Sequence, residues 1–395
     1  MKKGVFIRTL AILGPIALLQ SCHFRQAALV EASIEGGLAA DTAYIRYAPL
    51  SRTDSAAFDT LVLENGKFSW NPDIDEPVEV QIELGRDRKS YKGRPMAAPL
   101  AYSMRFVAQP DEKIRLQAVY EDGFLAYDLA GSYDLAMQSR IRNEVKDAYI
   151  AATRLGESIR EAMAGGAENA DEAYVDSLYD ALARFRNQIG DAALDYVRQH
   201  PERVHAAYFL LTHPERDTFL TYYPILKEDL RNGRMAERLE AARKTAERMR
   251  TIRQNAERLS PGAQAPDFTL LDLKGRPVKL SDYSNRHVVI DFWGTWCQWC
   301  VKGIPQMKAA YARHKGKVVF LSIACRDKAE RVQAFVEREH IGWINVMNDD
   351  FGNDIALMYG VSGFPTKILL EPGLKVKNRY LGEVPEFYQD LDQIK

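Results

Sequence analysis

Hydrophobic and polar residues alternate with a period of two through the first third of the chain, from about residue 32 to residue 130. The clearest stretches are 78–84 and 114–118, in which every second residue is apolar. This period is typical of strands that bury one face of a sheet. Asn65-Gly66 lies between two apolar runs and indicates a hairpin, because primed turns need positive φ. The pattern therefore predicts an antiparallel all-β, sandwich-like domain.

Between about residues 132 and 259 the apolar positions recur with the period of a helix. One stripe contains Val175, Leu178, Leu182, Phe185 and Ile189, and a second contains Met235, Leu239, Ala242, Ala246, Met249 and Ile252. Such stripes could form a groove for a partner. Packing against one another and against neighbouring domains is the favoured interpretation, because no pattern of cofactor ligands accompanies them. We expect an α-helical connecting region here.

Strands and helices alternate after Ser260-Pro261-Gly262, which marks a linker. Residues 288–292 form a run in which Asp291 is the only residue that is not apolar, and residues 318–323 form a second run of this kind. Such runs are typical of buried parallel strands. The C-terminal region is therefore expected to be α/β. The predicted organisation is an N-terminal segment at 1–22, an all-β domain at 23–131, a helical region at 132–259 and an α/β domain at 260–395.

The first 22 residues have the pattern of an export signal. Three basic residues lie within the first eight positions, and the apolar run at 10–19 that follows is too short to span a bilayer comfortably. Leu19-Gln20-Ser21-Cys22 resembles the lipobox of bacterial lipoproteins, although Gln20 replaces the usual small or β-branched residue. The resemblance implies lipidation of Cys22 and attachment to a membrane that faces the periplasm. An unmodified Cys22 after a cleaved signal peptide is the alternative.

Charge and cysteine content narrow the function further. The chain has 53 basic and 54 acidic residues, so no electrostatic footprint for nucleic acid is present in these totals. It has four cysteines. If Cys22 carries lipid and Cys297 pairs with Cys300, only Cys325 remains, and no pair is left for a structural disulfide. The close pair is then a candidate for chemistry, whereas Cys325 is interpreted as a buried, apolar-like cysteine whose role stays open.

Cys297-Gln298-Trp299-Cys300 follows the apolar run at 288–292, where a helix is expected to begin. The spacing lets both sulfurs form a disulfide across one helical turn, and free N–H groups and the helix dipole stabilise a thiolate on the first cysteine. This placement lowers a cysteine pKa from about 8.5 to between about 3.5 and 7.5. We therefore expect Cys297 to be the attacking thiol and Cys300 the more buried, resolving one.

A zinc site and a static disulfide are the structural alternatives for this pair. Zinc needs about four ligands, and no second pair of cysteines or histidines lies near this one in the sequence. A static disulfide would leave Asp291 unexplained, because a lone acid in an apolar strand is costly unless it is neutral or functional. Redox chemistry without a metal or an organic cofactor is the favoured interpretation, with Cys297 and Cys300 as the redox-active disulfide.

From about residue 261 onwards the chain resembles the thioredoxin superfamily, and most closely the TlpA/ResA-like bacterial envelope oxidoreductases. Asp291 lies six residues before Cys297, and Pro305 lies five residues after Cys300. Residues 359–366, Tyr-Gly-Val-Ser-Gly-Phe-Pro-Thr, match the thioredoxin cis-proline segment. The resemblance thus implies a thioredoxin-like fold for residues 260–395.

The same resemblance implies roles for single residues. Asp291 would accept a proton, Pro365 would be cis and face Cys297, and Phe364 would offer backbone hydrogen bonds to a substrate. Trp296 directly before the motif and Trp299 inside it are also assigned to substrate binding. The sequence departs from the family at Gly303, where relatives commonly have Glu, and at Trp299, where Pro is usual. More weakly, Asp59 to Trp70 and the strand spacing resemble the small all-β domain that precedes thioredoxin domains in some envelope lipoproteins.

The resulting hypothesis is a protein-disulfide oxidoreductase of the bacterial envelope. Its expected partners are protein disulfides, a membrane electron donor and the membrane itself, and the resemblance implies reductant roles such as cytochrome c maturation. A peroxiredoxin-like thiol peroxidase is one alternative, because Ala265-Pro266-Asp267-Phe268 and Leu280-Ser281-Asp282-Tyr283 also open that related family; the Pro-x-x-x-Thr-x-x-Cys arrangement is missing. A binding lipoprotein with a vestigial thioredoxin domain is the other.

Overall fold

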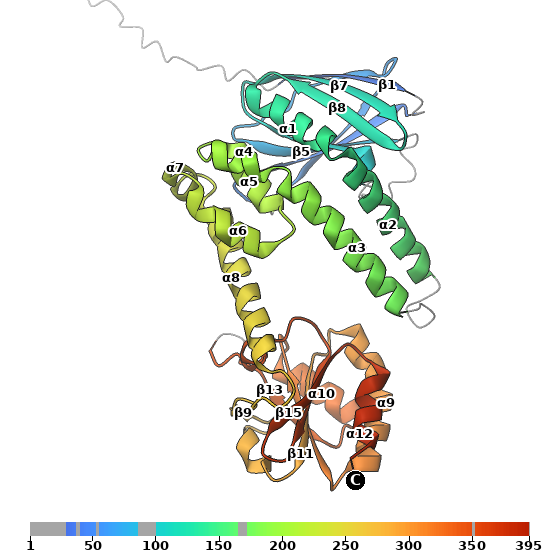
Figure 1. Ribbon diagram of the computed structural model, residues 1–395, viewed down its shortest axis with the longest axis vertical. Helices are drawn as coiled ribbons and strands as arrows, with labels where there is room; N and C mark the ends of the chain where they lie inside the picture. Colours follow the sequence, from blue (N-terminus) through green and yellow to red (C-terminus); the bar gives the residue numbers. More distant parts are fainter. Residues whose placement is uncertain are drawn as a thin grey trace, which may run out of the picture. The chain divides into compact units, whose positions relative to one another are not determined.

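The computed structural model describes residues 29–36, 40–52, 55–85, 100–164, 172–349 and 352–394. The chain forms two compact units, the first ending at Ala193 and the second beginning at Leu194 (Figure 1). The predicted export signal and Cys22 lie outside the described residues. The division falls within the helical region of the sequence, so the helices after residue 194 belong to the same unit as the α/β domain.

The first unit begins with two four-stranded sheets that share one hydrophobic core. Their strand orders are β4-β1-β7-β8 and β3-β2-β5-β6. The strands are β1 (Leu29–Gly36), β2 (Thr42–Pro49), β3 (Ala57–Val62), β4 (Lys67–Trp70), β5 (Val78–Gly85), β6 (Ser103–Ala108), β7 (Lys113–Glu121) and β8 (Phe124–Ala130). Buried and exposed residues alternate along β7, since one face is in the core. The sandwich-like prediction is confirmed.

Two pairings in this unit differ from a simple antiparallel hairpin arrangement. Asn65 and Gly66 have φ values of 53° and 73°, as the turn requires, but the strands on either side continue into different sheets and only Glu64 and Lys67 bridge across it. The neighbouring strands β1 and β7 pair in parallel. Alternation identifies the buried face of a strand but not its partner, so the antiparallel prediction is wrong for this one pair.

Helices close the first unit. They are η1 (Leu100–Tyr102), α1 (Tyr133–Glu144), α2 (Lys146–Ala164) and α3 (Glu172–Asp191). The Ser132 hydroxyl caps α1 by accepting a hydrogen bond from the Leu135 N–H. The stripe predicted along α3 packs against α2, with Leu178 and Leu182 buried beside Ala152 and Ile159. Packing between helices therefore accounts for this stripe.

The second unit opens with α4 (Leu194–Gln199), α5 (Val204–Thr212), α6 (Arg216–Tyr222), η2 (Tyr223–Ile225), α7 (Glu228–Asn232) and α8 (Ala236–Arg258). In the second predicted stripe Leu239, Ala246 and Ile252 are buried, whereas Met249 is 43% exposed. The C-terminal half of α8 contacts the α/β domain. Arg248 pairs with Asp354 at 2.6 Å, and the Asn255 amide donates a hydrogen bond to the Leu357 carbonyl oxygen at 2.9 Å.

The α/β domain is built on a five-stranded sheet of order β13-β12-β11-β14-β15. Strand β11 is parallel to β12 and antiparallel to β14. The strands are β11 (His287–Trp293), β12 (Val318–Ala324), β13 (Ile344–Met347), β14 (Thr366–Glu371) and β15 (Lys375–Leu381), with β9 (Thr269–Leu271) and β10 (Pro277–Lys279) forming a separate hairpin. The sequence runs at 288–292 and 318–323 are the two central parallel strands, as predicted.

Helices cover both faces of this sheet: η3 (Leu280–Tyr283), α9 (Gln298–His314), α10 (Ala329–Arg338), α11 (Ile355–Met358) and α12 (Pro385–Asp392). Val289 and Trp293 of β11 pack with α9, α10 and α12, which lie together in Figure 1. Val288, Ile290 and Phe292 pack on the other face with α11. Because successive side chains of β11 point to opposite faces, Asp291 lies on the same face as Val289 and Trp293, which α9 covers. Along the described ranges, no helix is long and apolar enough to span a bilayer.

Candidate redox site

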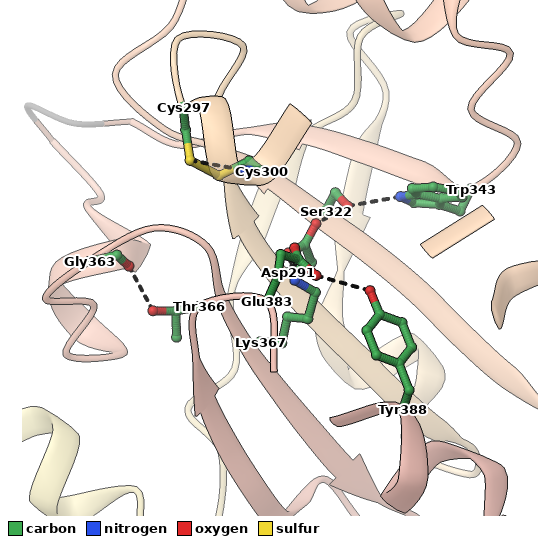
Figure 2. Close-up of polar contacts among 10 residues, drawn as sticks. All are labelled: Asp291, Cys297, Cys300, Ser322, Trp343, Gly363, Thr366, Lys367, Glu383 and Tyr388. Carbon is green, nitrogen blue, oxygen red and sulfur yellow. Dashed lines mark hydrogen bonds and ion pairs between the residues drawn. A yellow bond between two sulfur atoms is a disulfide. The ribbon is translucent and has the colours of Figure 1, made fainter. Parts of the chain in front are cut away.

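Cys297 and Cys300 form a disulfide where α9 begins (Figure 2). Cys297 is the N-cap residue, and its Sγ accepts a hydrogen bond of 3.1 Å from the Cys300 N–H. The two residues are 6% and 3% exposed. A helix N-terminus and an N–H donor both favour the charged form of a sulfur in the position of Cys297. The helix start predicted from the sequence is confirmed.

The loop between β11 and Cys297 is held by the segment after β12. The Thr295 N–H and hydroxyl both donate hydrogen bonds of 2.7 Å to Asp327 Oδ2. The Trp296 indole N–H donates to the Cys325 carbonyl oxygen at 3.0 Å. Asp327 was not among the residues predicted from the sequence, because no motif links it to the cysteine pair.

The Phe364-Pro365 bond is cis, in agreement with the resemblance to thioredoxin. The loop around it is braced on both sides: Thr366 donates from its hydroxyl to the Gly363 carbonyl oxygen at 2.7 Å (Figure 2), and Arg379 donates to the carbonyl oxygens of Tyr359 and Gly360, also at 2.7 Å. Pro365 lines a small cavity together with Cys300 and Asp291. Three of the predicted catalytic residues therefore meet at one place.

Asp291 is buried beneath the disulfide, in register with Ser322 of β12 on one side and Lys367 of β14 on the other. Its Oδ2 accepts a hydrogen bond of 2.9 Å from the Ser322 hydroxyl, which in turn accepts one from the Trp343 indole N–H at 2.8 Å (Figure 2). Lys367 Nζ lies 3.8 Å from Oδ1. Burial raises the pKa of Asp291, and Lys367 and Ser322 oppose that rise.

A second carboxylate lies beside Asp291. Lys367 Nζ contacts Glu383 Oε1 at 2.5 Å, and the Tyr388 hydroxyl donates to Glu383 Oε2 at 3.0 Å (Figure 2). Neither Lys367 nor Glu383 was expected from the sequence. Lys367 gave a usable signal, because it is a charged residue directly before the apolar run Ile368-Leu369-Leu370 of β14, much as Asp291 interrupts the apolar run of β11. Glu383 follows β15 in a loop and has no local pattern.

Comparison with known proteins assigns the family. Residues 261–379 match the AhpC/TSA family. The thiol-disulfide oxidoreductase ResA of Geobacillus thermodenitrificans is 34% identical over 137 residues, which are 34% of this chain and 78% of that protein. The chain belongs to the ResA-like thiol-disulfide oxidoreductases. ResA of Bacillus subtilis is 31% identical over 129 residues, covering 32% of this chain and 71% of the relative.

The match is confined to the C-terminal third of this ResA-like enzyme. Among solved structures, the thioredoxin domain of a thiol-disulfide oxidoreductase from Bacteroides vulgatus is 28% identical, covers 35% of this chain and 99% of that one, and has a TM-score of 0.33. The cysteine pair lies within the matched region, whereas the two sheets of the first unit lie outside it. The region that this chain shares with its relatives is therefore the one that contains the cysteine pair.

Aromatic side chains surround the cysteines of the ResA-like site. Trp296 and Trp299 are 43% and 46% exposed, and the Trp296 ring meets the Phe364 ring edge-on with a centroid distance of 5.3 Å. Lys302 Nζ lies 5.2 Å from the centre of the Trp299 ring, and the Arg326 guanidinium lies 5.6 Å from that of Phe364. The three residues assigned to substrate binding thus lie beside two cations. Cys325 is a buried thiol at the end of β12.

Proposed function

We propose that this ResA-like oxidoreductase reduces disulfides of other proteins through a mixed disulfide at Cys297. The Cys297 thiolate attacks one sulfur of the substrate disulfide, a Cys297–substrate S–S bond forms, and the other substrate sulfur leaves and takes up a proton. Cys300 then gives its proton to Asp291 and attacks Cys297 Sγ. The Cys297–Cys300 disulfide closes, the second substrate thiol is released, and two electrons have passed to the substrate.

One observation supports this order of events best: Asp291, Cys300 and Pro365 line one cavity, while Cys297 is the N-cap of α9. The N-cap position favours a thiolate on Cys297, so this sulfur suits the first attack. The buried carboxylate is on the side of Cys300, where a base is needed in the second step. A raised pKa moves a carboxylate towards the range in which it can exchange a proton with a thiol near neutral pH.

Replacing each cysteine separately tests this proposal. Cys297→Ser is expected to abolish insulin reduction, whereas Cys300→Ser should form a mixed disulfide with insulin that persists on a non-reducing gel. Cys325→Ser is the matched control, because this thiol belongs to the apolar core, and it should retain reductase activity. Consumption of hydrogen peroxide is measured in parallel. Peroxide turnover without insulin reduction would favour the thiol peroxidase instead.

We also propose that the enzyme faces the periplasm and is anchored through lipid on Cys22. The basic start, the apolar run and Leu19-Gln20-Ser21-Cys22 support this location. Radiolabelled palmitate should enter the wild-type protein during growth and should not enter Cys22→Ser. Equal labelling of the two proteins would contradict the anchor.

The proposed clients are apocytochromes c, whose paired thiols must be reduced before haem attachment, and the proposed source of electrons is a membrane protein. The resemblance to envelope reductants supports both assignments. An oxidised peptide containing Cys-x-x-Cys-His provides the test, because this sequence marks haem attachment. The reduced enzyme should reduce that peptide faster than the same peptide with His replaced by Ala, and equal rates would argue against this client class.

A further inference from the structure

Glu383 occupies the volume that a side chain at position 303 of α9 would need. A Cβ built on Gly303 would lie 2.3 Å from both Cδ and Oε1 of Glu383 and 2.7 Å from Oε2. Real Cβ atoms do not approach other atoms this closely, so the carboxylate can sit against α9 only because residue 303 has no side chain. A loop after β15 thus delivers a carboxylate to the helix of the cysteine pair.

This carboxylate belongs to the same cavity as the resolving cysteine. Glu383, Asp291 and Lys367 line it together with Cys300 and Pro365. The cavity measures about 10 Å³, which is close to the space that one water molecule needs, and polar groups from three elements face it. The cavity thus brings the resolving cysteine and both carboxylates to one place.

The charges around the cavity do not balance if both carboxylates are ionised. Lys367 contacts both Asp291 and Glu383, and its side chain is 2% exposed. Burial raises the pKa of Glu383, as does the nearby charge of Asp291, whereas Lys367 and the hydrogen bond from Tyr388 oppose the rise. Two interacting carboxylates that share one lysine bind a proton as a pair.

The two carboxylates differ in access to solvent. The Asp291 side chain is 7% exposed and lies between two strands, whereas the Glu383 side chain is 16% exposed and lies in a loop. A proton that Asp291 receives from Cys300 needs a way out before the next cycle. Glu383 is the more exposed of the pair and shares Lys367 with it, so it is placed to pass that proton on.

We propose that Glu383 is a positioning residue of the Cys300 step and the outlet of its proton. When Cys300 attacks Cys297 Sγ, its proton passes to Asp291, the Cys297–Cys300 bond forms, and the bond between Cys297 and the substrate sulfur breaks. The released substrate thiolate takes a proton from water. Glu383 and Lys367 then exchange the proton held by Asp291 with solvent. This inference rests on the proposed function, in which Asp291 accepts the Cys300 proton.

The first experiment measures resolution of a mixed disulfide by stopped flow between about pH 6 and 9, a range that brackets the ordinary cysteine pKa of about 8.5. Glu383→Gln keeps the shape of the side chain and should slow resolution about tenfold, less than the roughly 10²–10⁴-fold effect of a direct acid or base. Its pH profile should shift, while the rate of attack by Cys297 stays at the wild-type value. Glu386→Gln, which removes an exposed carboxylate of α12, is the control.

The second experiment moves the carboxylate back to the helix. Glu383→Gly should resolve slowly, and Glu383→Gly combined with Gly303→Glu should regain most of the lost rate, because the new side chain fills the same space. Thermal unfolding of each oxidised variant shows whether it is folded. A folded double variant that resolves no faster than Glu383→Gly would overturn the proposal.

Asp291→Asn distinguishes a failure of the Glu383 proposal from a failure of the proposed function of Asp291. If Asp291→Asn slows resolution but Glu383→Gln does not, the Glu383 proposal fails and the function of Asp291 stands. If neither variant slows resolution, both fail. If both slow it and Glu383→Gln also shifts the pH profile, the outlet is supported.

Discussion

The Asp327 carboxylate holds Thr295 at both its backbone N–H and its hydroxyl, each at 2.7 Å. The other oxygen of Asp327 accepts hydrogen bonds from the Lys328 N–H at 2.9 Å and from Arg331 Nε at 2.6 Å. The Asp327 side chain is fully buried. The loop that leads into Cys297 is therefore fixed to the start of α10 through one carboxylate, two residues before the attacking sulfur.

Asp327→Asn should destabilise the oxidised protein by about 1–3 kcal/mol at pH 7, because it removes the charge from a buried acceptor of four hydrogen bonds. Burial alone would raise the pKa of Asp327. The hydrogen bonds from Thr295, Arg331 and Lys328 outweigh burial and lower this pKa below its ordinary value. The ionised Asp327 carboxylate therefore stabilises the folded state fully above about pH 4, and this stabilisation is lost as the pH falls through the native pKa of Asp327. Urea unfolding at pH 7 and pH 3 should show the difference from wild type shrinking in acid.

The exposed ring of Trp299 should contribute to binding of protein substrates. Removing an aromatic contact of about 0.5–1.5 kcal/mol corresponds to a rise in KM for insulin of roughly two- to tenfold in Trp299→Ala. Trp299→Phe should retain most of the binding. Leu271→Ala, which removes an apolar side chain that is 56% exposed elsewhere in the domain, is the control. If Trp299→Ala has the wild-type KM, the assignment of Trp299 to substrate binding is wrong.

Local patterns were sufficient to predict the strands, the helix start and the centre of the site. Strand β11 is apolar on both faces because both are buried, and its single acid was identified as exceptional. Cys297 and Cys300 are three residues apart, so one helical turn brings them together. The parallel pairing of β1 with β7 could not be predicted, because alternation defines a face and not a neighbour.

The residues that surround Asp291 come from segments that the sequence separates widely. Lys367 meets Asp291 through the register of β14 with β11, and Glu383 arrives from the loop after β15. The departure at Gly303 was visible in the sequence as the loss of a carboxylate. In the structure no carboxylate is lost at this place, because Glu383 from another segment fills the space beside Gly303. Only the folded chain reveals such a replacement.

Gly360→Ala should separate α8 from the α/β domain. Gly360 has a φ of +63°, and a Cβ there would lie 2.3 Å from the backbone N of Ala256 and 2.6 Å from the carbonyl oxygen of Ile252, both in α8. Gly373→Ala is the matched control, because Gly373 has a φ of +88° but no atom within 4 Å of its Cβ position. The control should lose only about 1–2 kcal/mol from backbone strain.

We expect Gly360→Ala to lose clearly more stability than this control, and to show faster proteolysis within α8. Thermal unfolding and limited trypsin digestion of the oxidised proteins measure both effects. Equal losses in the two variants would mean that α8 does not depend on the close contact at Gly360.

Asp291→Asn should make the oxidised protein more stable at neutral and alkaline pH while slowing its catalysis. Burial raises the native pKa of Asp291, so the native state binds more protons than the unfolded chain above about pH 4, and wild-type stability falls as the pH rises through the native pKa. Asparagine cannot ionise and escapes this loss, and Lys367 keeps Glu383 as its partner. Urea midpoints should therefore agree at about pH 3 and diverge in favour of Asp291→Asn towards pH 8.

Stopped-flow traces of the same variant should show the mixed disulfide accumulating, because resolution by Cys300 loses its base. A stability difference that does not vary with pH would mean that Asp291 titrates normally, and unchanged resolution between pH 6 and 9, a range that brackets the ordinary cysteine pKa of about 8.5, would remove it from the proposed mechanism.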